Sequence, residues 1–256
     1  FDADLFAHGG VVDEHGKPRG GFQQAGHVLS AAAARPYLEK RVSGMLAKVP
    51  YTLWFMDCDG AGQYFDDYSP EHPASQAQDC AARIDRLNWI TSTFGLPIGS
   101  EGASATTAGR ICFAHGMLSG AIGWADKDHS DEHSKWWLGT YWPPEAPEYF
   151  FRRCPLKPRF RIEQYDPRFR LPLYETAMHD AVIATHHWET PSLKFKDEIV
   201  SSALMEQLYN VPALYHLTKG EFARIKKGLL AHYRFFSPLH RRLGLQPLTE
   251  FRWLTP

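Results

Sequence analysis

The chain alternates between short apolar runs and longer stretches in which apolar residues recur at helical spacing. Residues 51–56 (YTLWFM) are almost wholly apolar without alternation, which is typical of a strand covered on both faces in a parallel sheet. Residues 75–94 carry an apolar stripe on one helical face, and Gly95 is placed to end that helix. Residues 96–99 (LPIG) predict a second short strand. This strand–helix–strand order indicates parallel β/α units.

The later elements extend the same order along the chain. We predict helices over 28–48, 104–118, 197–209 and 221–236, and strands over 121–124 and 212–217. Pro36 is expected to break or kink the first of these helices. Residues 125–170 are charged, proline-containing and aromatic, which indicates a long excursion before the apolar segment 171–188.

These elements favour the α/β class and a (β/α)8 TIM-type barrel. About five strands are recognisable, whereas a closed barrel of this kind has eight. We therefore predict one catalytic barrel region over 1–256, with an inserted loop excursion at about 125–170, that carries only the C-terminal part of the barrel. Because the sequence begins at Phe1 and not at Met, we expect a fragment of a longer protein whose N-terminus is missing. The compartment is then undetermined, with a secreted or periplasmic location open.

Composition narrows the classes of partner. The 256 residues carry a formal net charge of −1 and contain no basic run, which argues against nucleic acid. No apolar stretch is long enough to span a bilayer, so no membrane association is expected. The four cysteines are widely spaced without a CxxC pair, so they indicate neither a zinc ribbon nor a disulfide scaffold. Nothing in the sequence determines the oligomeric state.

Two carboxylates stand where the two predicted strands end. Asp57 follows the first strand and Glu101 follows the second. Parallel strands end at the same rim, so both side chains can face one cavity, and a retaining glycosidase needs two carboxyl groups about 5 Å apart. The simpler interpretation is a helix cap or an ion pair in a loop. Asp59, two residues after Asp57, is a competing nucleophile because the spacing alone does not decide which carboxylate points inward.

Aromatic and polar residues in the predicted loops are candidates for binding a sugar. Indole rings can stack on the apolar faces of a pyranose, although most aromatic residues simply pack. The candidate substrate-binding residues are Asp59, Asp67, Tyr68, Trp136, Trp137, His179, Asp180, His187 and Trp188. Tyr141 and Trp142 lie in the same excursion, and Trp142 is a further candidate stacking surface.

A metal-dependent hydrolase is an alternative. Residues 129–133 (HSDEH) match the H-x-x-E-H pattern of inverted zinc peptidases, with His129 and His133 as the ligands. The surrounding residues are charged, which is typical of a solvated loop and not of a zinc helix, so we predict neither a metal nor an organic cofactor. A carbohydrate-binding protein without turnover is the third class, in which the acids only bind hydroxyl groups.

Two stretches of the chain carry a resemblance to a known family. They read FMDCDGAGQYFDDYSPEHPASQAQDCAARIDRLNWITSTFGLPIGSEG and YDPRFRLPLYETAMHDAVIATHHWETPSLKF, and the likeness spans roughly residues 51–102 and 165–216. This sequence resembles the catalytic barrel of the α-N-acetylgalactosaminidase-type glycoside hydrolases, families 129 and 101. The resemblance implies that Asp57 is the nucleophile and Glu101 the acid/base. We therefore predict a retaining glycoside hydrolase that acts on an α-linked carbohydrate without a cofactor.

Overall fold

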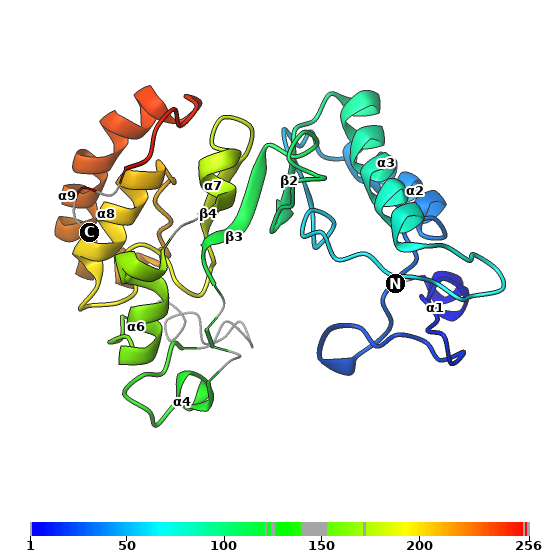
Figure 1. Cartoon of the computed structure of the whole chain (residues 1–256), viewed down its shortest axis with the longest axis horizontal. Helices are drawn as coiled ribbons and strands as arrows, with labels where there is room; N and C mark the ends of the chain where they lie inside the picture. Colours follow the sequence, from blue (N-terminus) through cyan, green and yellow to red (C-terminus); the bar gives the residue numbers. More distant parts are fainter. Residues whose placement is uncertain are drawn as a thin grey trace. The chain divides into compact units, whose positions relative to one another are not determined.

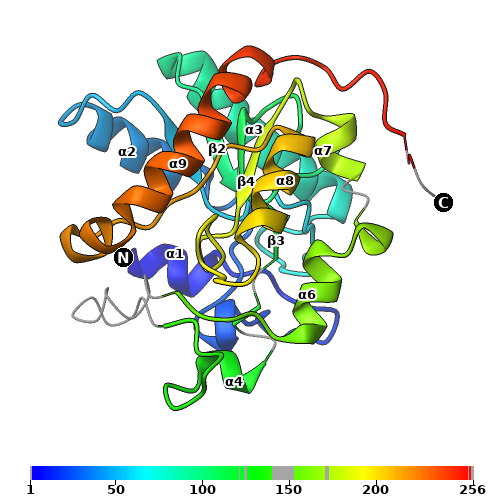
Figure 2. The same ribbon diagram turned by 90° about the vertical axis from the view of Figure 1, so that its left-hand side faces the viewer.

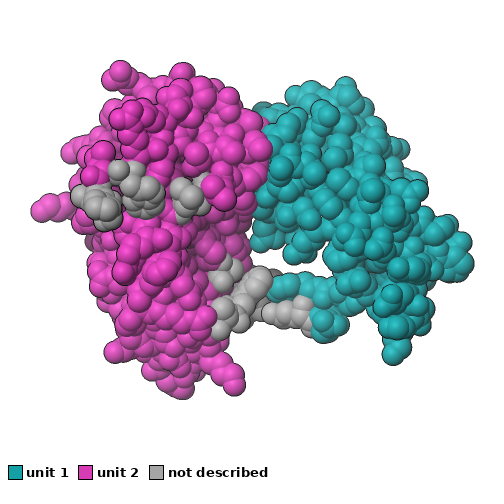
Figure 3. Space-filling view, in the orientation of Figure 1, with its two compact units in different colours: residues 1–111 teal, residues 112–256 magenta. Residues whose placement is uncertain are grey.

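The structure, a computed structural model, describes residues 2–120, 122–123, 126–139, 153–170, 173–252 and 254. Backbone contacts divide the chain into two compact units, Phe1–Ile111 and Cys112–Pro256, which Figure 3 shows in different colours. Each unit contains one parallel pair of strands together with helices (Figure 1). The predicted α/β class with parallel strands is therefore confirmed.

The first unit is built around a strand–helix–strand sequence. Its elements are α1 (Ala3–His8), the 3₁₀ helix η1 (Phe22–Gln24), α2 (Arg35–Leu46), β1 (Trp54–Met56), α3 (Gln76–Phe94) and β2 (Ile98–Glu101). Strands β1 and β2 pair in parallel, with Trp54 opposite Ile98 and Met56 opposite Ser100. Helix α3 connects the two strands and contacts β2. The predicted helix and both predicted strands of this region are present, although the strands are shifted by two or three residues.

Helix α3 has both of its ends specified by local sequence. At the N-terminus the Ser75 hydroxyl accepts a hydrogen bond from the Gln78 amide, and the Gln78 side chain accepts one from the Ser75 amide. At the C-terminus Gly95 adopts φ 66°, a left-handed conformation that glycine reaches without a steric penalty. Leu87 and Ile90 are fully buried on the inner face. Capping and the apolar stripe together explain why this helix was predictable.

Helix α2 is shorter than the predicted helix over 28–48. Residues 28–34 are not part of the helix, which begins at Arg35. Pro36 lies in the first turn and does not break the helix. A first-turn residue has no helical partner for its amide, so the missing N–H of proline is tolerated there and its fixed φ suits the helix.

The second unit also contains a parallel pair of strands, β3 and β4. Its elements are β3 (Phe113–Ser119), α4 (Lys127–Ser130), α6 (Pro158–Tyr165), the 3₁₀ helix η2 (Pro167–Phe169), α7 (Leu173–Ala177), β4 (Ile183–His186), α8 (Ile199–Tyr209) and α9 (Lys219–Leu243). Phe113 lies opposite Ile183 and Ser119 opposite His186, with a shift of register between these pairs. The predicted helices 197–209 and 221–236 are confirmed as α8 and α9, which lie side by side in Figures 1 and 2.

Three other predictions in this region differ from the structure. The helix predicted over 104–118 is wrong, because its second half forms β3 and Gly116, at φ 81°, is incompatible with an α-helix. The strand predicted over 212–217 is not formed, and these residues have no regular secondary structure. The Leu214 carbonyl accepts from the Ser192 amide, and the Leu214 amide donates to the Ser192 hydroxyl. Of the strand predicted over 121–124, Ile122 and Gly123 are not in a strand, and the other two residues lie outside the described residues.

Among the described residues of the second unit, two clusters of buried apolar side chains stand out. One gathers residues from the excursion and from the segment before α8: Ile122, Leu138, Cys154, Leu156, Phe160 and Phe195. The other lies between the strands and α8: Leu118, Ala184, Tyr209 and Val211. All four cysteines of the chain are free. Among the described residues, the helices are too short or too polar to cross a membrane.

The Ser75 cap yields a first testable prediction. Replacing Ser75 by Ala leaves amide groups at the start of α3 without their acceptor, and we expect the free energy of unfolding to fall by about 1 kcal/mol. Chemical denaturation measures this loss. Ser92→Ala, an exposed substitution on the same helix, is the control and should change stability by less than about 0.5 kcal/mol. Equal stability of the two variants would contradict the role of the cap.

Candidate active site

Two carboxylates lie side by side at the ends of β1 and β2. Asp57 directly follows β1, and Glu101 is the last residue of β2. Because Met56 pairs with Ser100 in parallel register, the two acids leave the strands at the same edge. One oxygen of each carboxylate and the Sγ of Cys58 all lie within 4.8 Å of one another. Asp57 is exposed and Glu101 is half-buried, so both can be reached from solvent.

The loop after β1 is held against the end of β2 by a short chain of hydrogen bonds. The Ser100 hydroxyl donates to the Met56 carbonyl at 2.6 Å and accepts from the Gly60 amide at 2.8 Å. The Thr107 hydroxyl donates to the Gly60 carbonyl at 2.9 Å. A Cβ on Gly60 would come within 2.7 Å of the Ser100 side chain, so only glycine allows this close approach. These contacts place Asp57 beside Glu101.

The electrostatics of the pair raise the pKa of Glu101. Partial burial raises the pKa of Glu101, and the neighbouring Asp57 carboxylate raises it further. The thiol of Cys58 opposes these effects by donating to the Glu101 carboxylate at 3.5 Å. A carboxyl group whose pKa is raised in this way retains a proton closer to neutral pH, as a general acid requires.

Asp59 has a different environment from Asp57. It is buried, and one of its oxygens lies 2.6 Å from Nη2 of Arg86 and 3.2 Å from Nη1 of Arg83, both on α3. Arg83 also contacts Asp79 at 3.0 Å. Burial raises the pKa of Asp59 above its ordinary value, and Arg86 and Arg83 offset this effect only in part. Asp59 therefore connects the loop after β1 to α3 through buried ion pairs.

Asp67 and Tyr68 lie in a turn of the first unit. Asp67 is buried and accepts hydrogen bonds from the amides of Val12 and Ser69, each at 3.0 Å. Its second oxygen lies 2.7 Å from Nδ1 of His72. The ring of Tyr68 is exposed, whereas its amide donates to the Val12 carbonyl. The Asp67 carboxylate thus stabilises its own loop, and Tyr68 alone of these two presents its side chain to solvent.

His187 and Trp188 form an aromatic cluster of the second unit, just after β4. The ring of His187 lies 4.7 Å from that of Trp188 and 5.4 Å from that of His115. The Trp188 amide donates to Nε2 of His115 at 3.1 Å. Burial, with a smaller contribution from His115, lowers the pKa of His187 to about 4, so this imidazole is neutral at physiological pH.

The other predicted binding residues have individual environments in the second unit. Trp137 is buried, and Lys135 lies 4.5 Å from the ring of Trp136. His179 forms a hydrogen bond with the Gln246 carbonyl, and Asp180 is exposed. Tyr141 and Trp142 lie outside the described residues.

The H-x-x-E-H pattern does not gather a metal site. His129 is buried against the ring of Phe160, whereas the side chain of His133 is exposed beside Glu132. Over the described ranges, one group of three potential ligand side chains lies close enough to share an ion, and it consists of Asp57, Cys58 and Glu101. It contains no histidine, and exposed acidic groups are common without an ion, so we assign no metal.

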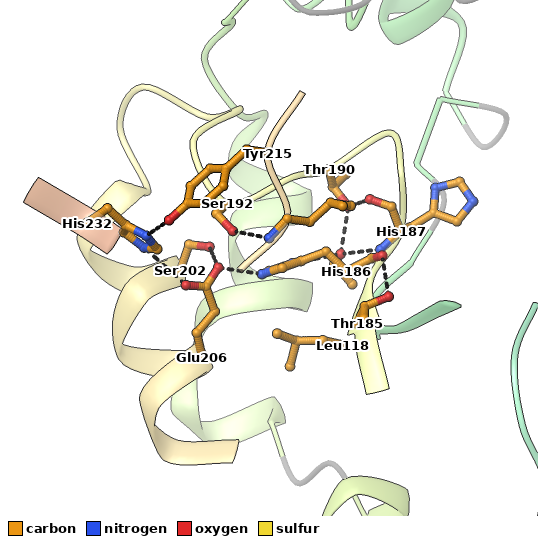
Figure 4. A network of polar contacts seen from close by, with 12 residues as sticks. Leu118, Thr185, His186, His187, Thr190, Ser192, Ser202, Glu206, Tyr215 and His232 are labelled. Atoms are coloured by element: carbon orange, nitrogen blue, oxygen red, sulfur yellow. Dashed lines mark hydrogen bonds and ion pairs between the residues drawn. The ribbon is translucent and has the colours of Figure 1, made fainter. Parts of the chain in front are cut away.

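A buried polar network lies next to His187 (Figure 4). His186, the last residue of β4, places Nε2 2.7 Å from Oε1 of Glu206 on α8. The other oxygen of Glu206 lies 3.0 Å from Nε2 of His232 on α9, and Nδ1 of His232 lies 2.6 Å from the Tyr215 hydroxyl. The network therefore connects β4 with both long helices of the unit.

Ser119 extends this network to the ends of the strands. Its hydroxyl lies 3.1 Å from Nδ1 of His186 and 2.6 Å from the Thr190 hydroxyl, and it accepts from the His187 amide at 3.1 Å. Burial raises the pKa of Glu206, but the hydrogen bond with His186 and the close contact of His232 outweigh it and lower the pKa to about 2. Glu206 is thus ionised at neutral pH, although it is fully buried.

Sequence reasoning missed several residues that hold these sites. Arg83 and Arg86 lie three residues apart on the buried face of α3, and charged residues at core positions of a helix could have indicated partners for a buried acid. Gly60 directly follows Asp59, and a glycine after two acids is a weaker signal of a close backbone contact. Glu206 and His232 are separated from His186 by long stretches of chain, and no sequence signal joins them.

Comparisons with known proteins point to one family. The family described as glycosyl hydrolases related to the GH101 family, GH129, matches residues 1–256. Among solved structures, the α-N-acetylgalactosaminidase NagBb from Bifidobacterium bifidum in complex with GalNAc is similar, with 17% identity and a TM-score of 0.60 over 99% of this chain. A quadruple mutant of NagBb gives 16% identity and a TM-score of 0.61 over 99% of this chain.

The likeness to NagBb concerns the fold, because the identity is low. The chain covers 35% of the length of NagBb in the GalNAc complex and 34% of the length of the quadruple mutant. The complex of NagBb with Gal-NHAc-DNJ gives 16% identity and a TM-score of 0.60, and covers 96% of this chain. A search of curated proteins gave no match.

The buried ion pairs of Asp59 yield a stability prediction. Asp59→Asn removes the charge that compensates Arg83 and Arg86, and we expect the free energy of unfolding to fall by about 3 kcal/mol. Asp85→Asn, on the same helix but exposed, is the matched control and should cost less than about 1 kcal/mol. Denaturant titration of both variants measures the difference, and a fully stable Asp59→Asn variant would contradict a structural role for this carboxylate.

The Glu206 network yields a pH-dependent prediction. The pKa of Glu206 is lower in the folded protein than its ordinary value of 4.5, so its stabilisation is present above pH 4.5 and is lost as the pH falls toward about 2. We therefore expect Glu206→Gln to be less stable than wild type by about 3 kcal/mol at neutral pH, and the difference to shrink between pH 4.5 and 2. Denaturation at several pH values measures this difference.

The control for this experiment is Glu163→Gln, which removes an exposed carboxylate of α6. Its effect on stability should stay below about 1 kcal/mol at every pH, because exposed ion pairs contribute little. A destabilisation by Glu206→Gln that does not change with pH would show that lost packing, and not the ionised carboxylate, is responsible.

Proposed function

The chain belongs to the family of glycosyl hydrolases related to GH101, GH129, and from this premise we propose that it forms the catalytic part of a retaining glycoside hydrolase acting on an α-linked sugar. The observation that carries the proposal is the proximity of Asp57 and Glu101 at the ends of neighbouring parallel strands, with carboxylate oxygens within 4.8 Å. Retaining enzymes place their carboxyl groups about 5 Å apart, whereas inverting enzymes need about 6.5–9.5 Å to admit a water molecule.

The two carboxylates have distinct roles in this proposal. In the first step the Asp57 carboxylate attacks the anomeric carbon while Glu101 gives its proton to the glycosidic oxygen, so the leaving group departs as a neutral alcohol. In the second step Glu101 takes a proton from water, the water oxygen attacks the anomeric carbon, and the bond to Asp57 breaks. The raised pKa of Glu101 supports its role as the group that starts protonated.

Asp57 is a better candidate than Asp59 for the nucleophile. A nucleophile must present a free oxygen to the substrate, and Asp57 is exposed beside Glu101. Asp59 is buried and bound to two guanidinium groups, which reduce its nucleophilicity and restrict its access. We assign Asp59 to the support of the site.

The proposed substrate is a carbohydrate with an α-linked N-acetylgalactosamine. This choice rests on the name of the similar protein NagBb, an α-N-acetylgalactosaminidase whose structure contains GalNAc. We propose Trp188 as a candidate sugar contact, because it is partly exposed and its ring is fixed against that of the buried His187. We further propose that the parallel strands form part of a (β/α)8 barrel, in which such acids stand at the C-terminal ends of strands.

The test replaces each carboxylate by its amide. We expect Asp57→Asn and Glu101→Gln each to lower kcat/KM on an aryl α-N-acetylgalactosaminide at least about a hundredfold, because each removes a group used in bond breaking. Stability should change little, since Asp57 is exposed and Glu101 is half-buried. Glu39→Gln, a half-exposed substitution on α2 away from the two acids in sequence, is the control and should retain full activity.

Azide distinguishes the two roles and tests retention. A small anion can attack the glycosyl intermediate without a general base, so azide should restore turnover of an activated substrate in Glu101→Gln and yield an α-glycosyl azide. Asp57→Asn should not give that retained product. Full activity of Asp57→Asn with a loss confined to Asp59→Asn would reverse the assignment. Unchanged turnover in all three variants would exclude the two-carboxylate mechanism.

A further inference from the structure

Cys58 lies between the two acids in the sequence and contacts one of them in space. Its Sγ lies 3.5 Å from Oε2 of Glu101, within hydrogen-bonding reach for sulfur, and the thiol is the donor. The same sulfur, one oxygen of Asp57 and one oxygen of Glu101 lie within 4.8 Å of one another. The thiol is therefore adjacent to the atoms that the proposed reaction uses.

The backbone at Cys58 is in a conformation that favours glycine. Cys58 has φ 63°, in the left-handed region, and of the described residues only Gln24 and Asn210 share a positive φ without being glycine. The Asp59 amide donates to the Asp57 carbonyl and the Ala61 amide to the Cys58 carbonyl, so the turn around Cys58 is tight. Strained backbone of this kind is found mainly at functional sites, so this conformation next to the two acids is consistent with a role for the Cys58 side chain.

The thiol stays protonated beside the carboxylates. Although the residue is exposed, partial desolvation of its sulfur raises the pKa of Cys58, and the charges of Asp57, Glu101 and Asp59 raise it further, to about 12. Cys58 is thus a thiol at any working pH of the enzyme, which makes it a hydrogen-bond donor and not a nucleophile.

We propose that Cys58 is a positioning residue for Glu101: its thiol donates to Oε2 and turns Oε1 toward the glycosidic oxygen. This inference rests on the proposed function, because it assumes that Glu101 is the acid/base. The proton that reaches the leaving group comes from Oε1, and the same oxygen takes a proton from water in the second step. The proton of Cys58 stays on sulfur throughout.

The leaving group separates this role from a merely structural one. A methyl α-glycoside needs a correctly placed acid because methoxide leaves poorly, whereas a dinitrophenyl α-glycoside departs with little protonation. Misplacing Glu101 therefore slows the first substrate more than the second. A general loss of folded enzyme, or a distorted sugar site, slows both substrates alike.

The experiment measures kcat/KM for the methyl and dinitrophenyl α-N-acetylgalactosaminides with wild type and five variants. Cys58→Ala should lose roughly fivefold on the methyl glycoside, the effect of one hydrogen bond, and less than about twofold on the dinitrophenyl glycoside. Cys58→Ser keeps a donor and should recover most of the loss. Cys80→Ala, on α3, is the control and should leave both values unchanged.

The fourth variant, Cys58→Gly, tests whether a loss of activity comes from misfolding. Glycine suits the left-handed backbone, so its Tm should not fall below that of wild type, yet it should show the same selective loss on the methyl glycoside. Equal losses on both substrates, or no loss, in Cys58→Ala and Cys58→Gly would overturn the positioning role. Glu101→Gln, the fifth variant, tests the assumption that Glu101 is the acid. If its loss of kcat/KM does not depend on the leaving group, Glu101 is not the acid, and both proposals fail.

Discussion

Two like charges held within a few ångströms repel one another, and the site at the ends of β1 and β2 depends on overcoming that repulsion. Asp57 and Glu101 have oxygens within 4.8 Å. The chain holds them there through the Ser100 hydroxyl, which connects the last carbonyl of β1 with the Gly60 amide. The parallel register of the strands provides the approximate placement, and the hydrogen bonds of Ser100 and Gly60 refine it. The repulsion itself is then useful, because it raises the pKa of Glu101.

Two further carboxylates of the chain, both buried, are each stabilised by basic side chains beside them. Asp59 is buried one residue beyond Cys58, and two arginines of α3 balance it. Glu206 is fully buried in the second unit, and His186 and His232 contact its two oxygens. In each case the charged group joins the end of a strand, or the loop after it, to a helix. An ion pair in such a position specifies how the helix packs, because any other arrangement leaves a buried charge without a partner.

Polar contacts also determine which residues are available to a substrate. Asp67 and Asp59 have carboxylates that could bind hydroxyl groups, but both are buried and occupied by partners of their own unit. Asp57 is exposed, and Glu101 is half-buried. The difference between a catalytic candidate and a structural acid therefore lies in exposure and partners, since the residue types are the same.

The sequence alone determined those features that depend on neighbours along the chain. Helix α3 was predictable because Ser75, Gly95 and the apolar stripe all lie within it or at its ends, and Asp57 and Glu101 were identified because each directly ends an apolar strand. The family resemblance added the expected roles of these two acids, and the family match confirms that resemblance.

Tertiary structure decided what depends on residues far apart in sequence. The different environments of Asp57 and Asp59 depend on the arginines of α3, which pair with Asp59 alone. The structure of residues 104–118 depends on the pairing of β3 with β4, which outweighs helical spacing. Partnerships such as His186 with Glu206 have no sequence signature. Hydrophobic periodicity reports which face of an element is buried, whereas long-range hydrogen bonds and ion pairs form only once the chain has brought those faces together.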